Sequence, residues 1–196
     1  SVYSKVKGEF VLQKNNGLNK THGWWNVIKA VDMDQDGDLD LIAGNWGLNS
    51  RLQASTKEPL TLYTKDFDDN GSEETLITYF YQGEETPFVS KDELVKQMPS
   101  INKKYLSYSE FANASVADIF GKQNLDKAPQ EKAYELGSCY FENIGNGQFK
   151  KHRLPFSAQI SSVNDIWVED FNKDGFPDLL LVGNNFEISP QLSSLD

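Results

Sequence analysis

The chain contains the nine-residue acidic loop Asp32-Met-Asp34-Gln-Asp36-Gly37-Asp38-Leu-Asp40 and repeats its pattern twice, as Asp66-Phe-Asp68-Asp-Asn70-Gly71-Ser72-Glu-Glu74 and Asp170-Phe-Asn172-Lys-Asp174-Gly175-Phe176-Pro-Asp178. In each copy, side chains that carry oxygen occupy positions one, three, five and nine, and glycine occupies position six. Ca²⁺ binds about six to eight oxygen ligands, and glycine permits the sharp turn that gathers them around one point. One such loop could arise by chance, but three indicate calcium sites.

The loop pattern assigns the calcium ligands by position. Side chains at positions one, three, five and nine offer carboxylate, carboxamide or similar oxygens, and the residue at position seven offers its backbone carbonyl. Without a cation, the carboxylates crowded into the first loop would repel one another and loosen the adjoining strands. The candidate ligands are Asp32, Asp34, Asp36, Asp38, Asp40, Asp66, Asp68, Asn70, Ser72, Glu74, Asp170, Asn172, Asp174, Phe176 and Asp178.

The residues after the loops exclude an EF-hand. That motif requires a bidentate Glu at position twelve and a helix on each side, but position twelve is Ala43, Ile77 or Leu181 here. Each loop is instead followed by a short run of apolar or β-branched residues, which is typical of a strand. The sequence therefore places the acidic loops between strands.

A longer repeat surrounds the first and third loops. Each has a Gly-Xaa-Phe triplet, an asparagine six residues before the first loop aspartate, and a strand that ends in Gly-Asn. A unit of this kind builds propeller blades or solenoid turns, because a single unit cannot bury its own faces. The matching pairs are Glu9-Phe10 with Gln148-Phe149, Asn26 with Asn164, and Leu41-Ile-Ala-Gly44-Asn45 with Leu180-Leu-Val-Gly183-Asn184.

The three acidic loops, the Gly-Asn-Gly-Gln-Phe stretch that ends at Phe149 and the Asp-Leu-Leu-Leu-Val-Gly-Asn stretch that ends at Asn184 resemble the FG-GAP or VCBS repeats. These repeats form the β-propeller that is also seen in the integrin alpha subunit. The chain looks most like large bacterial secreted or surface members, some of which carry an ASPIC/UnbV domain. The resemblance covers residues 1–82 and 137–190 and implies structural Ca²⁺ in the loops. Glu74 replaces the usual aspartate, so we expect the second site to be weaker.

The expected fold is all-β with a helical insertion. We assign residues 1–196 to a propeller segment and residues 86–136 to the insertion. Without the insertion about 145 residues remain, which at roughly 45 residues per blade makes three blades at most. We therefore expect a fragment of a larger propeller with no closed ring, and exposed terminal edges that invite self-association.

Two capping boxes predict helices in the insertion. Ser90-Lys-Asp-Glu93 opens a short helix that stops at Pro99, and Ser107-Tyr-Ser-Glu110 opens a second with a C-terminal cap at Gly121. The apolar stripe of the second helix needs a surface to pack on. We therefore favour a role in covering a sheet edge over a role in partner recognition.

Composition narrows the possible partners. The 196 residues carry a net charge of −10, which argues against a nucleic-acid surface because such surfaces concentrate Lys and Arg. No run of apolar residues is long enough for a membrane span.

Cys139 is the only cysteine, so we expect a buried thiol and no internal disulfide. The first residues contain no leader-like segment, and we expect the chain to be a piece of a longer protein.

Candidate catalytic residues are few. His22 and His152 stand in separate turn-like stretches, where a surface histidine is more common than a base or a zinc ligand. Trp25 and Trp167 are expected to pack beside strands, and Trp24 and Trp46 could pack or line a sugar platform. No catalytic triad or phosphate loop is present.

Two function classes remain from the sequence. We favour a non-catalytic, calcium-stabilised scaffold of a secreted or cell-surface protein that binds protein or glycan, in the extracellular space, the periplasm or the outer membrane. The alternative is an accessory or catalytic part of a polysaccharide-degrading enzyme. That alternative would require a base beside a carboxylate that is not a calcium ligand, and the sequence shows no such cluster.

Overall fold

The computed structural model describes residues 2–184, which belong to two compact units. The first unit combines Ser1–Leu52 with Glu135–Asp196, and the second is Gln53–Tyr134. The second unit is therefore inserted in the sequence of the first. Within the described residues, no helix has the length and apolar character needed to cross a membrane.

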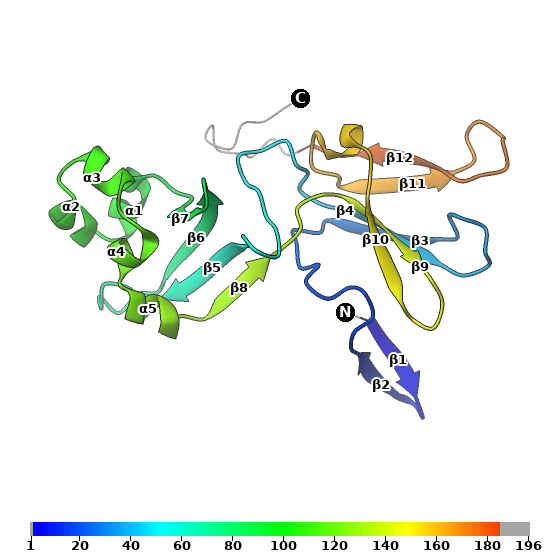
Figure 1. Cartoon of the computed structure of the whole chain (residues 1–196), viewed down its shortest axis with the longest axis horizontal. Helices are drawn as coiled ribbons and strands as arrows, with labels where there is room; N and C mark the ends of the chain where they lie inside the picture. The colour runs from blue at the N-terminus through cyan, green and yellow to red at the C-terminus, as the bar shows by residue number, and fades with distance from the viewer. Residues whose placement is uncertain (1, 185–196) are drawn as a thin grey trace. The chain divides into compact units, whose positions relative to one another are not determined.

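The first unit consists of one four-stranded antiparallel sheet and two hairpins (Figure 1). The order of the strands in the sheet is β10-β9-β4-β3, and the hairpins are β1-β2 and β11-β12. A short 3-10 helix, η1, precedes β11. The bounds are β1 Val2–Val6, β2 Glu9–Gln13, β3 Val27–Val31, β4 Asp40–Gly44, β9 Cys139–Asn143, β10 Phe149–Arg153, η1 Phe156–Gln159, β11 Asp165–Glu169 and β12 Asp178–Val182.

The four-stranded sheet has two apolar faces, because successive side chains of a strand point to opposite sides. We call the side that carries Ile42, Val27, Val31 and Tyr140 the Ile42 face. It packs against the β11-β12 hairpin, whose Ile166 is 2% exposed. We call the opposite side the Ala43 face, and it carries the apolar cluster of Ala43, Cys139, Phe141, Leu41, Phe149, Leu18 and Trp25. The thiol of Cys139 is buried, as expected.

The second unit packs short helices on a four-stranded antiparallel sheet of order β7-β6-β5-β8. Tyr63 and Leu76 from the sheet share a core with Leu94 and Ile119 from the helices. The bounds are β5 Leu60–Lys65, β6 Glu74–Tyr81, β7 Glu84–Pro87, α1 Lys91–Gln97, α2 Ser100–Lys104, α3 Tyr108–Ala112, α4 Val116–Phe120, α5 Lys122–Lys127 and β8 Gln130–Ala133.

Capping boxes start three of these helices. The boxes at Ser90 and Ser107 are present as predicted, and a third at Ser115 was not predicted. Gly121 caps α4 with a φ of 83°, a backbone conformation that favours glycine. The apolar stripe predicted for one helix is divided between α3 and α4, and its residues pack within their own unit.

The internal repeat also appears in the structure. The β3-β4 pair and the β11-β12 pair each enclose an acidic loop and have the same pairing, since Val31 faces Asp40 as Glu169 faces Asp178. The β1-β2 hairpin corresponds to β9-β10, because Phe10 and Phe149 follow the matching glycines. The first unit therefore contains one whole four-stranded repeat, with the second half of another before it and the first half of a third after it.

The mostly β fold with a short helical insertion is confirmed, and no closed ring of sheets occurs among residues 2–184. The helices α1 to α5 lie between Lys91 and Lys127, within the range 86–136 of the expected insertion. The compact unit that carries them extends over Gln53–Tyr134, because β8 pairs with β5 and joins both ends into one sheet. One detail differs from the sequence predictions. Trp167, expected to pack, is 62% exposed, because it points away from the Ile42 face.

Candidate metal centre

Each acidic loop joins two neighbouring antiparallel strands. The first lies between β3 and β4, the second between β5 and β6, and the third between β11 and β12. At position four the backbone is left-handed, with φ of 63° at Gln35, 57° at Asp69 and 63° at Lys173. The glycines at position six have φ of 97°, 90° and 92°, values that disfavour any residue with a β-carbon. The three loops therefore share one backbone shape.

The carboxylate at position one holds each turn together. In every loop it accepts hydrogen bonds from the backbone N–H groups of positions five and six. These bonds measure 3.2 and 3.0 Å at Asp32, 3.1 and 2.8 Å at Asp66, and 3.1 and 2.9 Å at Asp170. Position one therefore shapes the loop and is also a candidate ligand.

The carboxylate at position nine closes each loop from the other side. It accepts a hydrogen bond from the N–H of position two, at 3.0 Å for Asp40, 2.8 Å for Glu74 and 3.0 Å for Asp178. Glu74 makes the same bond as the two aspartates, so its longer side chain fits this frame. The side-chain oxygen at position five accepts from the N–H of position seven in all three loops, at 3.0, 2.8 and 2.9 Å.

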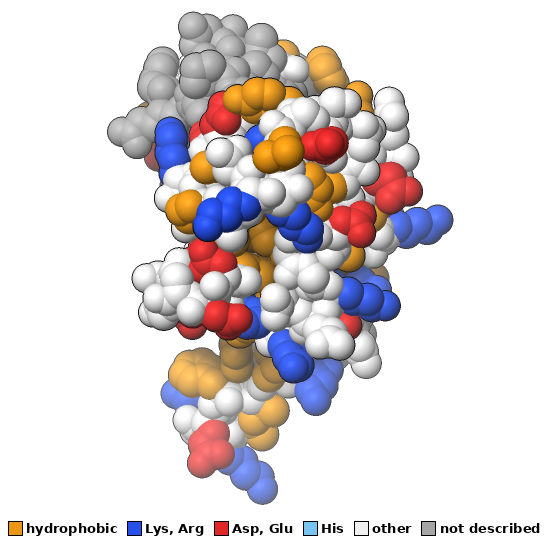
Figure 2. Space-filling view, turned by 90° about the vertical axis from the view of Figure 1, so that its left-hand side faces the viewer, with side chains coloured by type: hydrophobic (Ala, Val, Ile, Leu, Met, Phe, Trp, Pro, Cys, Tyr) orange, Lys and Arg blue, Asp and Glu red, His pale blue; other side chains and the backbone are white. Residues whose placement is uncertain are grey.

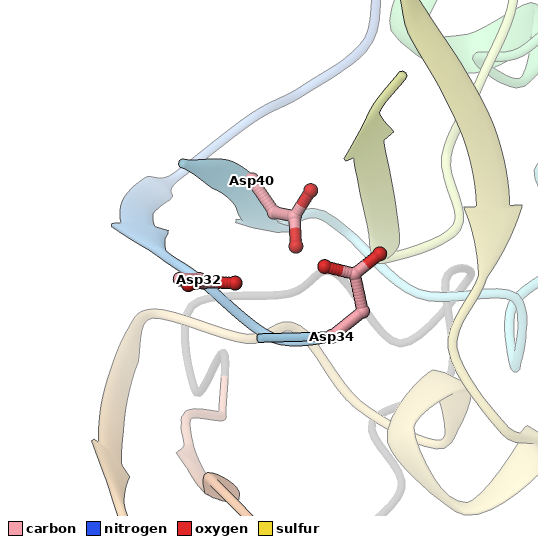
Figure 3. A group of neighbouring side chains, drawn as sticks. All are labelled: Asp32, Asp34 and Asp40. Atoms are coloured by element: carbon pink, nitrogen blue, oxygen red, sulfur yellow. The ribbon is translucent and has the colours of Figure 1, made fainter. Parts of the chain in front are cut away.

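The first loop brings three carboxylates together. Asp32 and Asp34 lie on the turn after β3 and Asp40 lies at the start of β4, with their carboxylates directed toward a common space (Figure 3). One oxygen from each residue lies within 4.8 Å of the others. Three clustered carboxylates form the hard oxygen donor set that suits Ca²⁺. This group can hold a metal ion.

The second loop contains a matching group in the other unit. Asp66, Asp68 and Glu74 each offer an oxygen within 4.8 Å of the others. The Oδ1 atom of Asp68 is buried and accepts no hydrogen bond among the described residues. A buried carboxylate oxygen without a donor is costly, and a cation in the loop would supply the missing partner. The unpartnered oxygen of Asp68 therefore supports a metal ion in this loop, independently of the spacing of the loop residues.

The third loop keeps the frame but not the same carboxylate group. Position three is Asn172, whose amide donates a hydrogen bond to Oδ2 of Asp174 at 3.0 Å. Within the described part of the chain, close groups of three acidic or other metal-binding side chains occur in the first and second loops only. Asp170, Asp174 and Asp178 retain their positions in the hydrogen-bonded frame.

Mutual repulsion is visible in the electrostatics of the first loop. The pKa of Asp34 is raised by partial desolvation and by the neighbouring carboxylates, although a hydrogen bond from the Asp36 N–H opposes the shift. The pKa of Asp38 is raised by desolvation and then by Asp36 and Asp40. The Oδ1 atom of Asp38 is also buried and has no hydrogen-bond partner among residues 2–184. The hydrogen-bond donors of the loop thus leave part of its carboxylate oxygens without a partner.

Asp40 is fixed by donors from β9, which the sequence did not predict. Its Oδ1 accepts from the Asn143 N–H at 2.7 Å, and its Oδ2 accepts from the Tyr140 hydroxyl at 2.9 Å. The carboxylate is only 1% exposed. Burial and the charge of Asp40 raise the pKa of Tyr140, so the hydroxyl remains a donor. The first loop is therefore attached to the strand that follows the inserted unit.

The first and third loops are also linked to each other. The side-chain amide of Gln35 donates to the carbonyl of Gly175, and Lys29 pairs with Asp165 at 3.1 Å. Both contacts join the β3-β4 pair to the β11-β12 pair. The two loops of the first unit therefore lie side by side.

Two further clusters of titratable groups lie outside the acidic loops. The buried Glu135 binds Lys151 and Arg153, the latter at 2.9 Å. His152 lies 2.7 Å from Glu142 and stacks on Tyr140 at 5.6 Å between ring centroids. The sequence predicted a surface histidine at position 152 but not these contacts, because Glu142 and Tyr140 lie on the neighbouring strand β9.

Comparisons of the chain with models of protein families, with curated proteins and with solved structures give no match. The candidate metal centre is defined by the shared frame of the three loops, the two carboxylate groups and the two buried carboxylate oxygens.

Proposed function

We propose that the chain is a calcium-binding β scaffold, in which each acidic loop holds one Ca²⁺ and clamps the two strands that it joins. The observation that carries this proposal is the unpartnered Oδ1 of Asp68 within the group formed with Asp66 and Glu74. The first loop supports it with the same arrangement of Asp32, Asp34 and Asp40. Bound Ca²⁺ would supply the positive charge that offsets the repulsion among these carboxylates.

The residues of the loops shape the turn and bind the ion in this proposal, and several of them do both. Positions one and nine shape the turn through the backbone N–H groups and also face the ion. At position three, Asp34 and Asn172 also accept a backbone hydrogen bond from position five, whereas Asp68 has an unpartnered oxygen for the ion. Position five and the carbonyls of Asp38, Ser72 and Phe176 complete the ligand set.

We further infer that the four-stranded sheet of the first unit is one propeller blade and that its two hairpins are halves of neighbouring blades. The repeat of the β3-β4 pair in β11-β12, and of β9-β10 in β1-β2, supports this assignment. It also agrees with the resemblance to FG-GAP and VCBS repeats. On this basis the scaffold belongs to a secreted or cell-surface protein, binds protein or glycan and has no catalytic activity. Sites of extracellular modules bind Ca²⁺ with dissociation constants of about 10⁻⁴ to 10⁻³ M.

Thermal unfolding of chelator-treated protein, with and without millimolar Ca²⁺, tests the proposal. If the Ca²⁺ concentration is about ten times the dissociation constant, a site adds about 1.4 kcal/mol of stability. Asp68→Asn should weaken the stabilisation by Ca²⁺, because it removes the charge of the unpartnered carboxylate. Glu84→Gln, in the exposed part of β7, provides a control in the same unit. Equal melting temperatures with Ca²⁺ and with chelator would refute the proposal.

A further inference from the structure

The first and third acidic loops are in direct contact. Gln35 occupies position four of the first loop, between the candidate ligands Asp34 and Asp36. Its side-chain amide donates a hydrogen bond to the carbonyl of Gly175, at position six of the third loop. A residue between two ligands of one candidate site is therefore bonded to the other loop.

The acceptor of this bond belongs to a peptide group that also holds a candidate ligand. The peptide after Gly175 accepts from Gln35 at its carbonyl. Its N–H, which belongs to Phe176, donates to Oδ1 of Asp174 at 2.9 Å. Because a peptide group is planar, a bond that fixes its carbonyl also fixes the direction of this N–H. The position of Gln35 therefore affects the orientation of Asp174.

A shared apolar core connects the same two loops. Met33, at position two of the first loop, packs in one cluster with Leu179, which follows the last residue of the third loop. The buried centre of this cluster includes Ile42 and Ile166, which are 0% and 2% exposed. Packed protein interiors have low compressibility and transmit displacements. Ordering of one loop is therefore felt at the base of the other.

Polar contacts hold β3 and β11 together below the loops. Lys29 on β3 pairs with Asp165 on β11 at 3.1 Å. Just before these strands, the side-chain amide of Asn26 donates to Oδ1 of Asn164 at 3.2 Å. These two asparagines are equivalent in the internal repeat. The first and third loops thus extend from one connected framework.

The second loop has a separate set of contacts. Its residue at position two, Phe67, is 9% exposed and lies 5.2 Å from Phe120 of α4 between ring centroids. The described apolar cluster around Phe67 consists of residues of the second unit. Its residue at position four is Asp69, whose carboxylate cannot donate the hydrogen bond that Gln35 makes. The second loop therefore serves as an internal control for the other two.

We propose that the first and third loops bind Ca²⁺ with positive cooperativity through the Gln35 contact, whereas the second loop binds independently. This inference rests on the proposed calcium function and adds a coupling between two of its sites. Ca²⁺ in the first loop would hold the carboxylates on both sides of Gln35 and so order the Gly175 peptide before the third loop binds. An ion that binds an ordered loop loses less conformational entropy. By linkage, Ca²⁺ in the third loop must raise the affinity of the first loop by the same factor.

Charge effects between the loops act separately from this contact. Two neighbouring Ca²⁺ ions repel each other, which opposes positive coupling, although physiological salt screens exposed charges that are more than about 8 Å apart. Figure 2 shows acidic and basic side chains interspersed over one face of the molecule, so no extended patch of one sign lies there. Gln35→Ala is the informative substitution, because it removes the contact between the loops without changing any charge.

A residue-resolved NMR titration of the chelator-treated chain with Ca²⁺ tests the coupling. The backbone N–H groups of Gly37, Gly71 and Gly175 bind the position-one carboxylates of the three loops, so each reports its own site. Asp34→Asn weakens the first site and should lower the affinity reported by Gly175 about threefold, as expected for two similar sites with a coupling factor of about ten. The matched control is Asp68→Asn, the same substitution in the second loop, which should leave that affinity unchanged.

Gln35→Ala separates the contact from the charge. In the wild type, Gly37 and Gly175 should follow one sigmoidal transition, and in this variant each should follow its own hyperbolic curve. Lys173→Ala is the control, because Lys173 occupies position four of the third loop with the same φ of 63° as Gln35. This control should keep the sigmoidal transition.

Two results would overturn the coupling but not the calcium proposal. One is independent, hyperbolic binding at Gly37 and Gly175 in the wild type, and the other is cooperativity that persists in full in Gln35→Ala. In both cases each loop still binds Ca²⁺. Absence of saturable Ca²⁺ binding at all three glycines would refute the calcium proposal itself, and the coupling with it.

Discussion

At the scale of single residues, the carboxylates at positions one and nine of the acidic loops both shape the turn and offer oxygens to an ion. The glycine at position six and the acids at positions one and nine could be identified from the sequence, because their spacing is local. The partners of Asp40 could not, since Tyr140 and Asn143 lie 100 and 103 residues further along the chain. The partners of Glu135 could not be identified either, because Lys151 and Arg153 lie on β10.

Tyr140→Phe tests whether the hydroxyl positions Asp40 for metal binding. The variant removes one hydrogen bond to the buried carboxylate but keeps the aromatic ring beside His152. We expect stability in chelator to fall by about 1 kcal/mol. Calcium affinity of the first loop should fall about tenfold, as for other groups that orient metal ligands. Titration calorimetry measures the affinity, and Tyr81→Phe, at an exposed tyrosine, is the matched control. Unchanged affinity would limit Tyr140 to a packing role.

Glu135 gives a pH-dependent prediction. Burial alone would raise its pKa, but hydrogen bonds from Lys151 and the Gly137 N–H, with the help of Arg153, lower it below the ordinary 4.5. A carboxylate with a lowered pKa stabilises the fold above its unfolded pKa, and this contribution disappears as the pH falls through the folded value. Glu135→Gln should therefore cost about 1 to 3 kcal/mol at neutral pH.

The difference between this variant and the wild type should shrink as the pH falls below 4.5 and through the lowered pKa of the folded state, because the wild-type carboxylate then becomes protonated. Urea unfolding in chelator at neutral and acidic pH measures that difference directly. A difference of equal size at both pH values would mean that the charge of Glu135 does not stabilise the fold.

At the scale of elements, local signals predicted the strands after the loops and the two capping boxes, because alternation and capping depend on neighbouring residues. The extent of the inserted unit was less predictable. Its last strand, β8, has the polar sequence Gln-Glu-Lys-Ala and forms because Leu60 of β5 pairs with Ala133. Such a pairing depends on residues that are distant in sequence, so no local pattern indicates it. The exposure of Trp167 has a similar explanation, because it depends on which side of β11 packs on the Ile42 face.

At the scale of the whole molecule, the acidic loops are divided between the two compact units. The first and third loops belong to the first unit, and the second loop belongs to the second. The chain carries a net charge of −10, and the loops concentrate part of this charge at the strand ends. We therefore expect calcium to stabilise both units, each through its own loops, rather than to act at a single centre.

The number of calcium ions bound by the chelator-treated chain tests the account most directly. Isothermal titration calorimetry should show saturable binding of about three ions per chain with dissociation constants of roughly 10⁻⁴ to 10⁻³ M. Asp34→Asn should abolish or weaken one of these sites, and Asp68→Asn should do the same to another, because the two residues belong to different carboxylate groups. Magnesium should compete poorly, since it requires a tighter octahedral shell. A titration with no saturable binding of Ca²⁺, or one that is unaffected by both substitutions, would contradict the account.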